Sequence, residues 1–110
     1  MAVLPHVRLL DLHGAIESAG LSRERIALLA GLERFSSQLV ESATPSSQIL
    51  TDLSALSDVE QLTDGTVPLL RWLQNAVSLA GSRREKSVFE RARDAVEFRA
   101  LLLRLYPDVN

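Results

Sequence analysis

The two histidines are the first candidates for chemistry, because an imidazole can bind a metal ion or act as a general base near neutral pH. His6 and His13 are seven residues apart in the first expected helix. We find no carboxylate near them on the same helical face to complete a metal site, and no serine or cysteine nucleophile in a known local motif. We therefore expect structural roles for both histidines, on the surface or half-buried, and no bound metal ion.

The serines, glycines and carboxylates also lack the spacing of a catalytic site. No serine lies in a G-x-S-x-G or S-x-x-K motif, and several stand where helices are expected to begin. The five glycines are spread over residues 14–81 and form no phosphate-binding loop. The acidic residues of the middle region are expected to form a solvated face rather than a concave pair. We therefore expect no enzyme site and no cofactor within these 110 residues.

Length and composition indicate one small folded domain. Of the 110 residues, 46% are hydrophobic and 24% are charged, and the formal net charge is only −2, which favours a globule over disorder. The absence of cysteine excludes disulfides and thiolate zinc sites. No apolar run approaches the roughly 20 residues of a membrane helix, and residues 1–15 do not resemble a signal peptide. An isoelectric point near 5.6 argues against general nucleic-acid binding. We expect one cytoplasmic domain over residues 1–110.

Glycine and proline divide the chain into six short segments with helical periodicity. The expected N-caps of the second, fourth and sixth helices are Ser22, Thr44 and Ser82, with a capping box at Ser82 and a hydrophobic staple between Leu21 and Ile26. No segment has the alternation of a strand. The sequence therefore predicts an all-α fold, a compact six-helix bundle, with helices over residues 5–19, 22–31, 34–40, 45–58, 66–80 and 82–105.

The fifth and sixth expected helices carry the core-facing stripes that matter most for the bundle. In the fifth, apolar residues recur at helical spacing: Leu69, Trp72, Leu73, Ala76, Val77 and Ala80. We expect Trp72 to be a large core anchor, and an interface or ligand-stacking role is the alternative. The sixth helix is expected to turn a second set toward the core: Val88, Phe89, Ala92, Ala95 and Val96.

Charge is distributed unevenly along the chain. From Phe35 to Leu70 there are five acidic residues and no Lys or Arg, whereas from Arg71 onward there are eight basic and five acidic residues. Opposite patches on one small domain suit head-to-tail association or docking on a related domain, and solvated ion pairs along a helix are the alternative. The candidate interaction residues are Asp52, Asp58, Glu60 and Asp64 on the acidic side and Arg83, Arg84 and Lys86 on the basic side.

A second apolar stripe lies near the end of the last expected helix. Phe98, Leu101 and Leu105 fall on the side opposite Val88 and Val96, so one straight helix would expose them. Either the helix bends near Phe98, or the stripe packs on something outside this chain. The abrupt end at residues 108–110 suggests that the chain was cut from a longer protein.

Four segments of the chain resemble the effector-associated, death-like domains of bacterial conflict systems, including their CARD-like modules. D-G-x-V-P-L at residues 64–69, followed by W-L-x-N-A at residues 72–76, is the most specific part. The matching core covers residues 21–96, and residues 97–110 are expected to be the end of the last helix or a connector. The segments are RIALLAGL (25–32), QILTDLSAL (48–56), LTDGTVPLLRWLQNAVSLAG (62–81) and SVFERARDAV (87–96).

The resemblance implies a six-helix antiparallel death-fold bundle that acts as a recruitment module. Such domains are joined to trypsin-like or caspase-like proteases or to other effectors, and some are encoded beside bacterial gasdermins. The implied partners are another domain of the same kind, homotypic or heterotypic, and a covalently attached effector. No nucleic acid, membrane or catalytic residue is implied.

A small helical regulatory or DNA-binding domain is the alternative function. A helix-turn-helix reader needs Arg and Lys on one face of a recognition helix. The basic residues of the last helix are instead mixed with Glu90, Asp94 and Glu97. The sequence therefore favours a protein-interaction domain.

Overall fold

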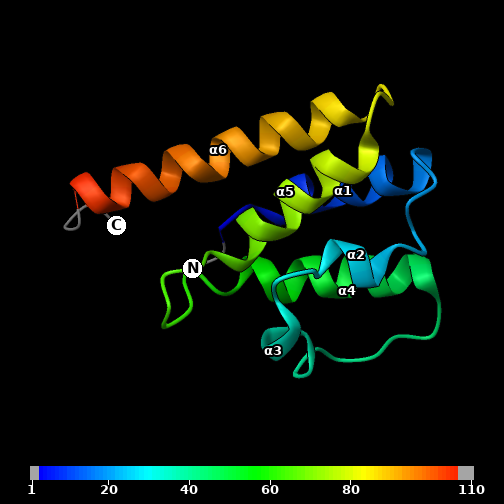
Figure 1. The fold of residues 1–110 in the computed structure, drawn as a ribbon, viewed down its shortest axis with the longest axis horizontal. Coiled ribbons are helices and arrows are strands. Elements are labelled where there is room, and N and C mark those ends of the chain that lie inside the picture. The colour runs from blue at the N-terminus through cyan, green and yellow to red at the C-terminus, as the bar shows by residue number, and fades with distance from the viewer. Residues whose placement is uncertain (1–2, 107–110) are drawn as a thin grey trace.

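Six helices and no strand make up residues 3–106, the part of the chain that the computed structural model describes (Figure 1). This confirms the all-α fold and the helical bundle. Helices α5 and α6 run antiparallel across a short turn, and α1 packs beside α4. The helices are α1 (His6–Ser18), α2 (Arg25–Leu28), α3 (Glu33–Ser36), α4 (Pro45–Ser57), α5 (Pro68–Ala80) and α6 (Lys86–Leu105).

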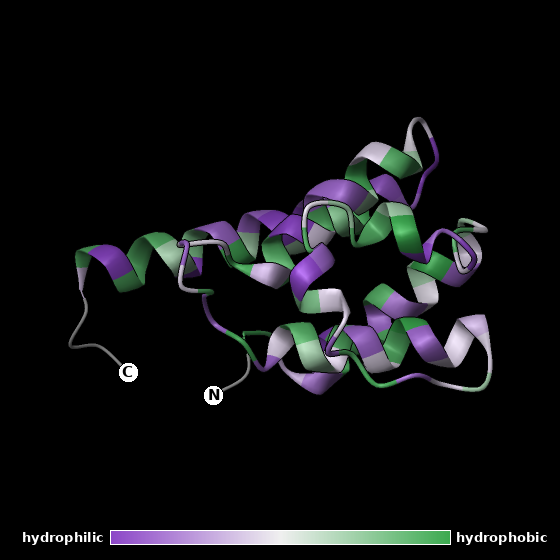
Figure 2. Cartoon of the chain, turned by 60° about the horizontal axis from the view of Figure 1, so that its bottom comes forward, coloured by the Kyte–Doolittle hydropathy of each residue, from purple (hydrophilic) through white to green (hydrophobic). Residues whose placement is uncertain are grey.

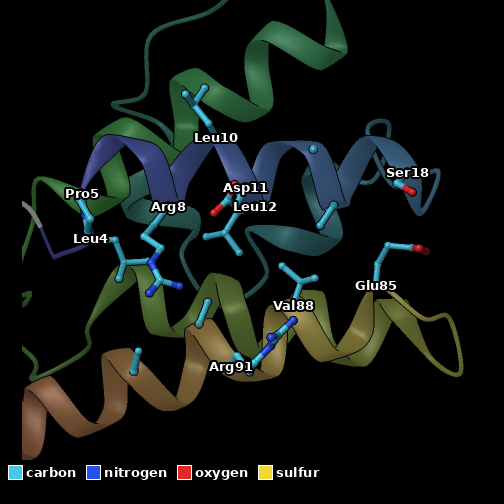
Figure 3. Close-up of a pocket in the computed structure, with 14 residues that line it drawn as sticks. Leu4, Pro5, Arg8, Leu10, Asp11, Leu12, Ser18, Glu85, Val88 and Arg91 are labelled. Carbon is cyan, nitrogen blue, oxygen red and sulfur yellow. The ribbon is translucent and has the colours of Figure 1, made fainter.

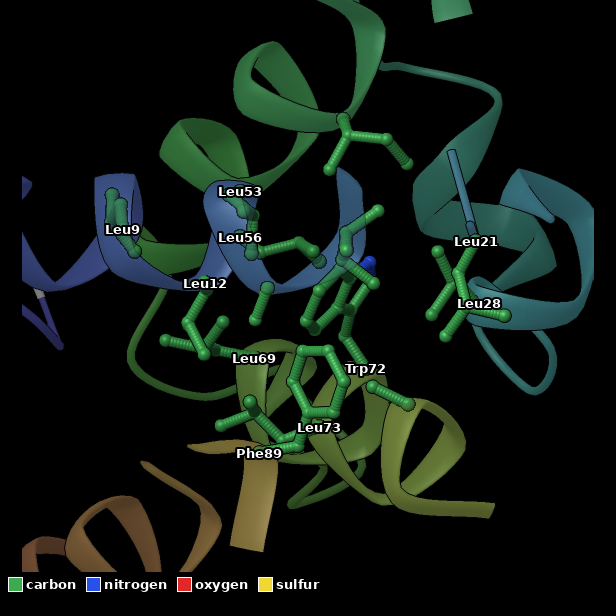
Figure 4. Close-up of a cluster of buried hydrophobic side chains, with 14 of the residues drawn as sticks. Leu9, Leu12, Leu21, Leu28, Leu53, Leu56, Leu69, Trp72, Leu73 and Phe89 are labelled. Carbon is green, nitrogen blue, oxygen red and sulfur yellow. The ribbon is translucent and has the colours of Figure 1, made fainter. Parts of the chain in front are cut away.

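Helix α5 lies at the centre of the bundle and contacts α2, α4 and α6. Its predicted stripe is fully buried at Leu69, Trp72, Leu73, Ala76 and Ala80, while Val77 is only partly buried. Trp72 lies among leucines of α1, α2, α4 and the turn before α2, and its ring forms a T-shaped pair with Phe89 of α6, with 6.4 Å between ring centroids (Figure 4). Trp72 is therefore the core anchor that the periodicity predicts.

Two of the predicted helix ends are formed as expected. Thr44 Oγ1 accepts a hydrogen bond from the Ser47 amide at 3.1 Å, and Ser47 Oγ accepts one from the Thr44 amide at 3.2 Å. This reciprocal capping box fixes the start of α4. Gly20, with φ +73°, follows the end of α1 and lets the Leu21 amide donate back to the Ile16 carbonyl.

The second and third helices are shorter than the sequence predicts. Ser22 caps no helix, because residues 21–24 form a separate turn and α2 begins only at Arg25. The predicted staple is wrong: Leu21 is buried, but Ile26 is 92% exposed. Gly31, at φ +86°, then interrupts the helical segment before α3. Each of the two helices is therefore a single turn of four residues.

The start and the inner face of α6 also differ from the prediction. The capping box at Ser82 does not form, because residues 83–85 make turns and the helix begins at Lys86 without a side-chain cap. Phe89 and Val96 are buried as expected, and Val88 and Ala92 are partly buried. Ala95 is exposed, since it lies on the outer side of the helix.

Helix α6 continues without a break through Phe98 to Leu105, which does not favour the first of the two alternatives, a bend near Phe98. Its C-terminal part projects beyond α1 and α5 (Figure 1), and hydrophobic residues lie along this projecting part (Figure 2). Residues 107–110 lie outside the described residues. The second apolar stripe is therefore exposed.

We predict that Trp72→Ala lowers the free energy of unfolding by about 3–5 kcal/mol, because it removes a fully buried aromatic side chain and leaves a cavity. Ile26→Ala, at an exposed apolar position, is the matched control and is expected to change it by less than about 0.5 kcal/mol. Urea denaturation followed by circular dichroism measures both. A loss below about 1 kcal/mol for Trp72→Ala contradicts its place in the core.

Candidate interaction surface

Asp52 does not belong to the interaction surface, contrary to the sequence-based prediction. The residue is 0% exposed, in the middle of α4. Its Oδ2 accepts a hydrogen bond from Arg25 Nε at 2.6 Å, and its Oδ1 accepts others from Arg25 Nη2 at 3.2 Å and Gln48 Nε2 at 2.8 Å. A buried carboxylate requires such partners, so this one is committed to the fold.

The Asp52 contacts join three parts of the bundle. Arg25 comes from α2, and its hydrogen bond to Asp52 raises the pKa of the guanidinium above its ordinary value. Gln48 comes from α4, where it also accepts from the Ser42 amide and donates to the Val40 carbonyl of the preceding loop. The network thus fixes α2 and the loop before α4 against α4.

The other three predicted acidic residues lie together in the connection between α4 and α5, and we call Asp58, Glu60 and Asp64 the acidic loop. All three are exposed. Glu60 Oε1 accepts a hydrogen bond from Arg99 Nη2 of α6 at 2.7 Å, which lowers the pKa of that carboxyl. Asp64 Oδ1 accepts from the Thr66 amide at 2.9 Å, and this lowers the pKa of Asp64. Both groups are therefore held in their anionic form at neutral pH.

The predicted basic residues lie in the turn between α5 and α6 and at the start of α6, and we call Arg83, Arg84 and Lys86 the basic turn. Arg83 Nη1 donates to the Leu79 and Ala80 carbonyls at 2.9 and 3.2 Å, so it caps the end of α5. Arg84 Nε donates to Glu85 Oε2 at 3.2 Å, and the Arg84 side chain is 91% exposed. Arg84 is therefore paired only with its neighbour in sequence, whereas Arg83 is held by the end of α5.

Helix α5 separates the two charged groups. The acidic loop directly precedes α5 and the basic turn directly follows it, so they lie at opposite ends of this buried helix (Figure 1). Thirteen residues of helix span roughly 20 Å, which exceeds the screening length of about 8 Å at physiological salt. Within one domain, the two groups are therefore screened from each other.

The predicted apolar stripe of α6 is larger than the sequence reasoning recognised. Phe98 is 61% exposed and Leu105 is 62% exposed, with Leu101 and Leu102 partly exposed beside them. We call Phe98, Leu101, Leu102 and Leu105 the outer face of α6. Leu102 was missed, although its position on the helix within about 40° of Phe98 could have identified it. Tyr106, directly after the helix, is also exposed and was missed.

The α5 part of the most specific sequence segment ties helices of the bundle together. Asn75 Nδ2 donates to the Leu28 and Ala30 carbonyls at 2.8 and 2.9 Å, which satisfies the end of α2. Arg71 Nε also donates to the Ala30 carbonyl, and its guanidinium lies so close to Gly31 that a Cβ there would approach Nε to 2.7 Å. These contacts tie α5 to α2.

The chain matches one known protein family. The sequence profile described as effector-associated domain 5 matches residues 3–104. The chain belongs to this family. No curated protein and no solved structure matches the chain. Membership of this family indicates an adaptor-like role linked to effector domains. Domains of this class are regulatory domains that accompany effector domains, rather than catalytic domains.

His13 of this effector-associated domain has a structural contact between α1 and α4. Its Nε2 lies 3.0 Å from the Ser46 carbonyl oxygen and 3.1 Å from Ser46 Oγ. Glu17 Oε1 lies 3.5 Å away, so the prediction of no carboxylate on this face was wrong. Among residues 3–106, however, no three His, Asp or Glu side chains gather as metal ligands.

A groove of about 840 Å³ runs between α1 and α6 of the domain (Figure 3). Arg8 and Arg91 reach it from the two helices, and Leu12 and Val88 line it between them. Ser18 is the one hydroxyl side chain in the described lining, which contains no histidine. No helix within residues 3–106 is long and apolar enough to cross a membrane.

We predict that Asp52→Ala lowers the free energy of unfolding by about 1–3 kcal/mol, because Arg25 and Gln48 lose their shared acceptor. The Arg25 side chain is 34% exposed and can turn partly to water, which keeps the cost below that of a fully buried pair. Asp58→Ala, at an exposed acid, is the control and is expected to cost less than about 0.5 kcal/mol. Equal effects in urea denaturation contradict the structural role of Asp52.

Proposed function

We propose that this effector-associated domain recruits an attached effector by docking onto a second domain of related fold. Membership of the family supports the adaptor-like part of this proposal. The observation that carries the docking part is the placement of the acidic loop and the basic turn at opposite ends of α5. A domain with complementary ends can bind head to tail, and repetition of that contact builds a chain of domains.

The proposed contact joins the acidic loop of one domain to the basic turn of the next. Asp58 and Asp64 carry the negative charge that no cation of the described chain offsets within 4 Å, since Glu60 already pairs with Arg99. Arg84 and Lys86 supply the positive charge. Exposed ion pairs each contribute about 0–1 kcal/mol and are weakened by salt, so a lone pair of domains binds weakly.

Weak docking becomes effective when many domains are held together. Tethering raises the effective concentration of a second binding event to the millimolar range for short flexible linkers. A sensor that gathers several copies would therefore bring their effectors into contact and activate them by proximity. The switch is clustering rather than a change in the fold of the domain.

The effector class in this proposal is a trypsin-like or caspase-like protease of bacterial anti-phage immunity, in a cytoplasmic assembly that includes a gasdermin system in some cases. The resemblance of the signature segments to death-like, CARD-like modules supports this assignment. The six-helix bundle with antiparallel α5 and α6 is compatible with a death fold. The acidic residues among the cations of α6 do not favour DNA as the partner.

We predict that the double variant Arg84→Glu and Lys86→Glu keeps its helical spectrum and its melting temperature nearly unchanged, because neither side chain is buried. The variant is expected to abolish effector-dependent defence in cells, since the contact with the acidic loop becomes repulsive. Arg23→Glu, an exposed charge reversal in the loop before α2, is the matched control and is expected to leave defence intact.

Compensation tests the assignment of the partner surface. A partner domain in which the residues equivalent to Asp58 and Asp64 are reversed to Arg is expected to restore part of the defence lost in the double variant. Full protection by the double variant alone would contradict the charged contact.

A further inference from the structure

The outer face of α6 is the largest group of exposed apolar side chains on one helix of the described chain. Phe98, Leu101, Leu102 and Leu105 lie within eight residues, and all are exposed. The opposite side of the same helix supplies Phe89 and Val96 to the core. Soluble monomers seldom leave such a continuous apolar strip uncovered.

Two opposite charges stand on one flank of this strip. Glu97 and Arg104 are seven residues apart, so they project from the same side of α6 two turns from each other. The Glu97 side chain is 50% exposed and lies 4.0 Å from Arg93, its neighbour one turn away. Both charges border a shallow groove of about 530 Å³ that Leu70 of α5 also lines. The flank is therefore acidic at one end and basic at the other.

We propose that the outer face of α6 packs antiparallel on the same face of a second copy of this chain. In an antiparallel helix pair, each flank meets the identical flank of the other helix in reverse order. Glu97 of one copy then faces Arg104 of the other, and the two-fold axis produces this pair twice. A parallel pair would instead place Glu97 beside Leu102, with no charge to meet.

The central apolar contacts fit the same register. Numbered as a heptad, Phe98 and Leu105 occupy position a and Leu101 occupies position d. The antiparallel pair packs Phe98 of one copy against Leu101 of the other. On the flank away from the charges, Leu102 meets the exposed Ala95. Asp94, paired with Arg93 at 3.1 Å, occupies position d opposite Leu105 of the other copy, so it limits the apolar contact to the central layers.

The interface is short, so the dimer is weak. A stable interface buries about 800 Å² on each partner, more than three turns of one helix provide. Pairing is therefore expected at the roughly millimolar concentrations that clustering produces. The contact uses neither the acidic loop nor the basic turn, so it can be tested independently of the proposed head-to-tail docking.

Reciprocal charge variants test the pairing. Glu97→Arg gives a chain with two cations on the flank, and Arg104→Glu gives a chain with two anions. Each variant alone is expected to dimerise roughly tenfold more weakly than the original chain in sedimentation equilibrium, because like charges face each other. An equimolar mixture is expected to form heterodimers at least as well as the original chain forms homodimers, because both flanking pairs become attractive. A mixture that stays as monomeric as its components overturns the proposal.

Substitution of the apolar residues gives a second, independent measurement. Leu101→Asp is expected to abolish dimerisation without loss of helical signal, since the Leu101 side chain is 47% exposed and is not a member of the buried core. Ile26→Asp, at an exposed apolar residue of α2, is the matched control and is expected to dimerise as the original chain does. Unchanged dimerisation of Leu101→Asp, or an original chain that stays monomeric up to about 1 mM, overturns the proposal.

Discussion

The complete burial of one face of α5 is the constraint on which the other features of this domain depend. Trp72 and its neighbours on that face remove their apolar surface from water only if α2, α4 and α6 all pack around them. The same arrangement places the connections at the two ends of α5 far apart, which separates the acidic loop from the basic turn. In this arrangement, α6 packs against the bundle only by its inner side, so the outer face of α6 stays exposed.

The residues that identify the family serve this frame. Asn75 and Arg71 bind the carbonyls at the end of α2, and Asp52 holds Arg25 from the neighbouring signature segment. Such residues can be shared by domains that bind different partners, because their polar contacts fix the helices of the bundle to one another. A motif of this kind identifies the fold of an adaptor but does not locate its binding site. The surfaces proposed here come from charge placement and exposure instead.

Helical periodicity was sufficient to predict the bundle, the Thr44 cap and the burial of Trp72, because these depend on residues near in sequence. The caps at Ser22 and Ser82 failed, since local turns competed with the helix start. Asp52 lies on the same arc of α4 as Ile49, Leu53 and Leu56, so its burial was detectable in the sequence. Its partner, Arg25, is 27 residues away, and only the tertiary structure brings the two together.

Native-state hydrogen exchange of the 110-residue chain tests the central role of α5 most directly. We predict that amides in the middle of α5, around Trp72 and Ala76, exchange slowest and only through global unfolding. The single-turn helices α2 and α3 and the projecting end of α6 are expected to exchange through local opening. Amides of α5 that exchange faster than those of α1 and α4 would contradict a bundle organised around α5.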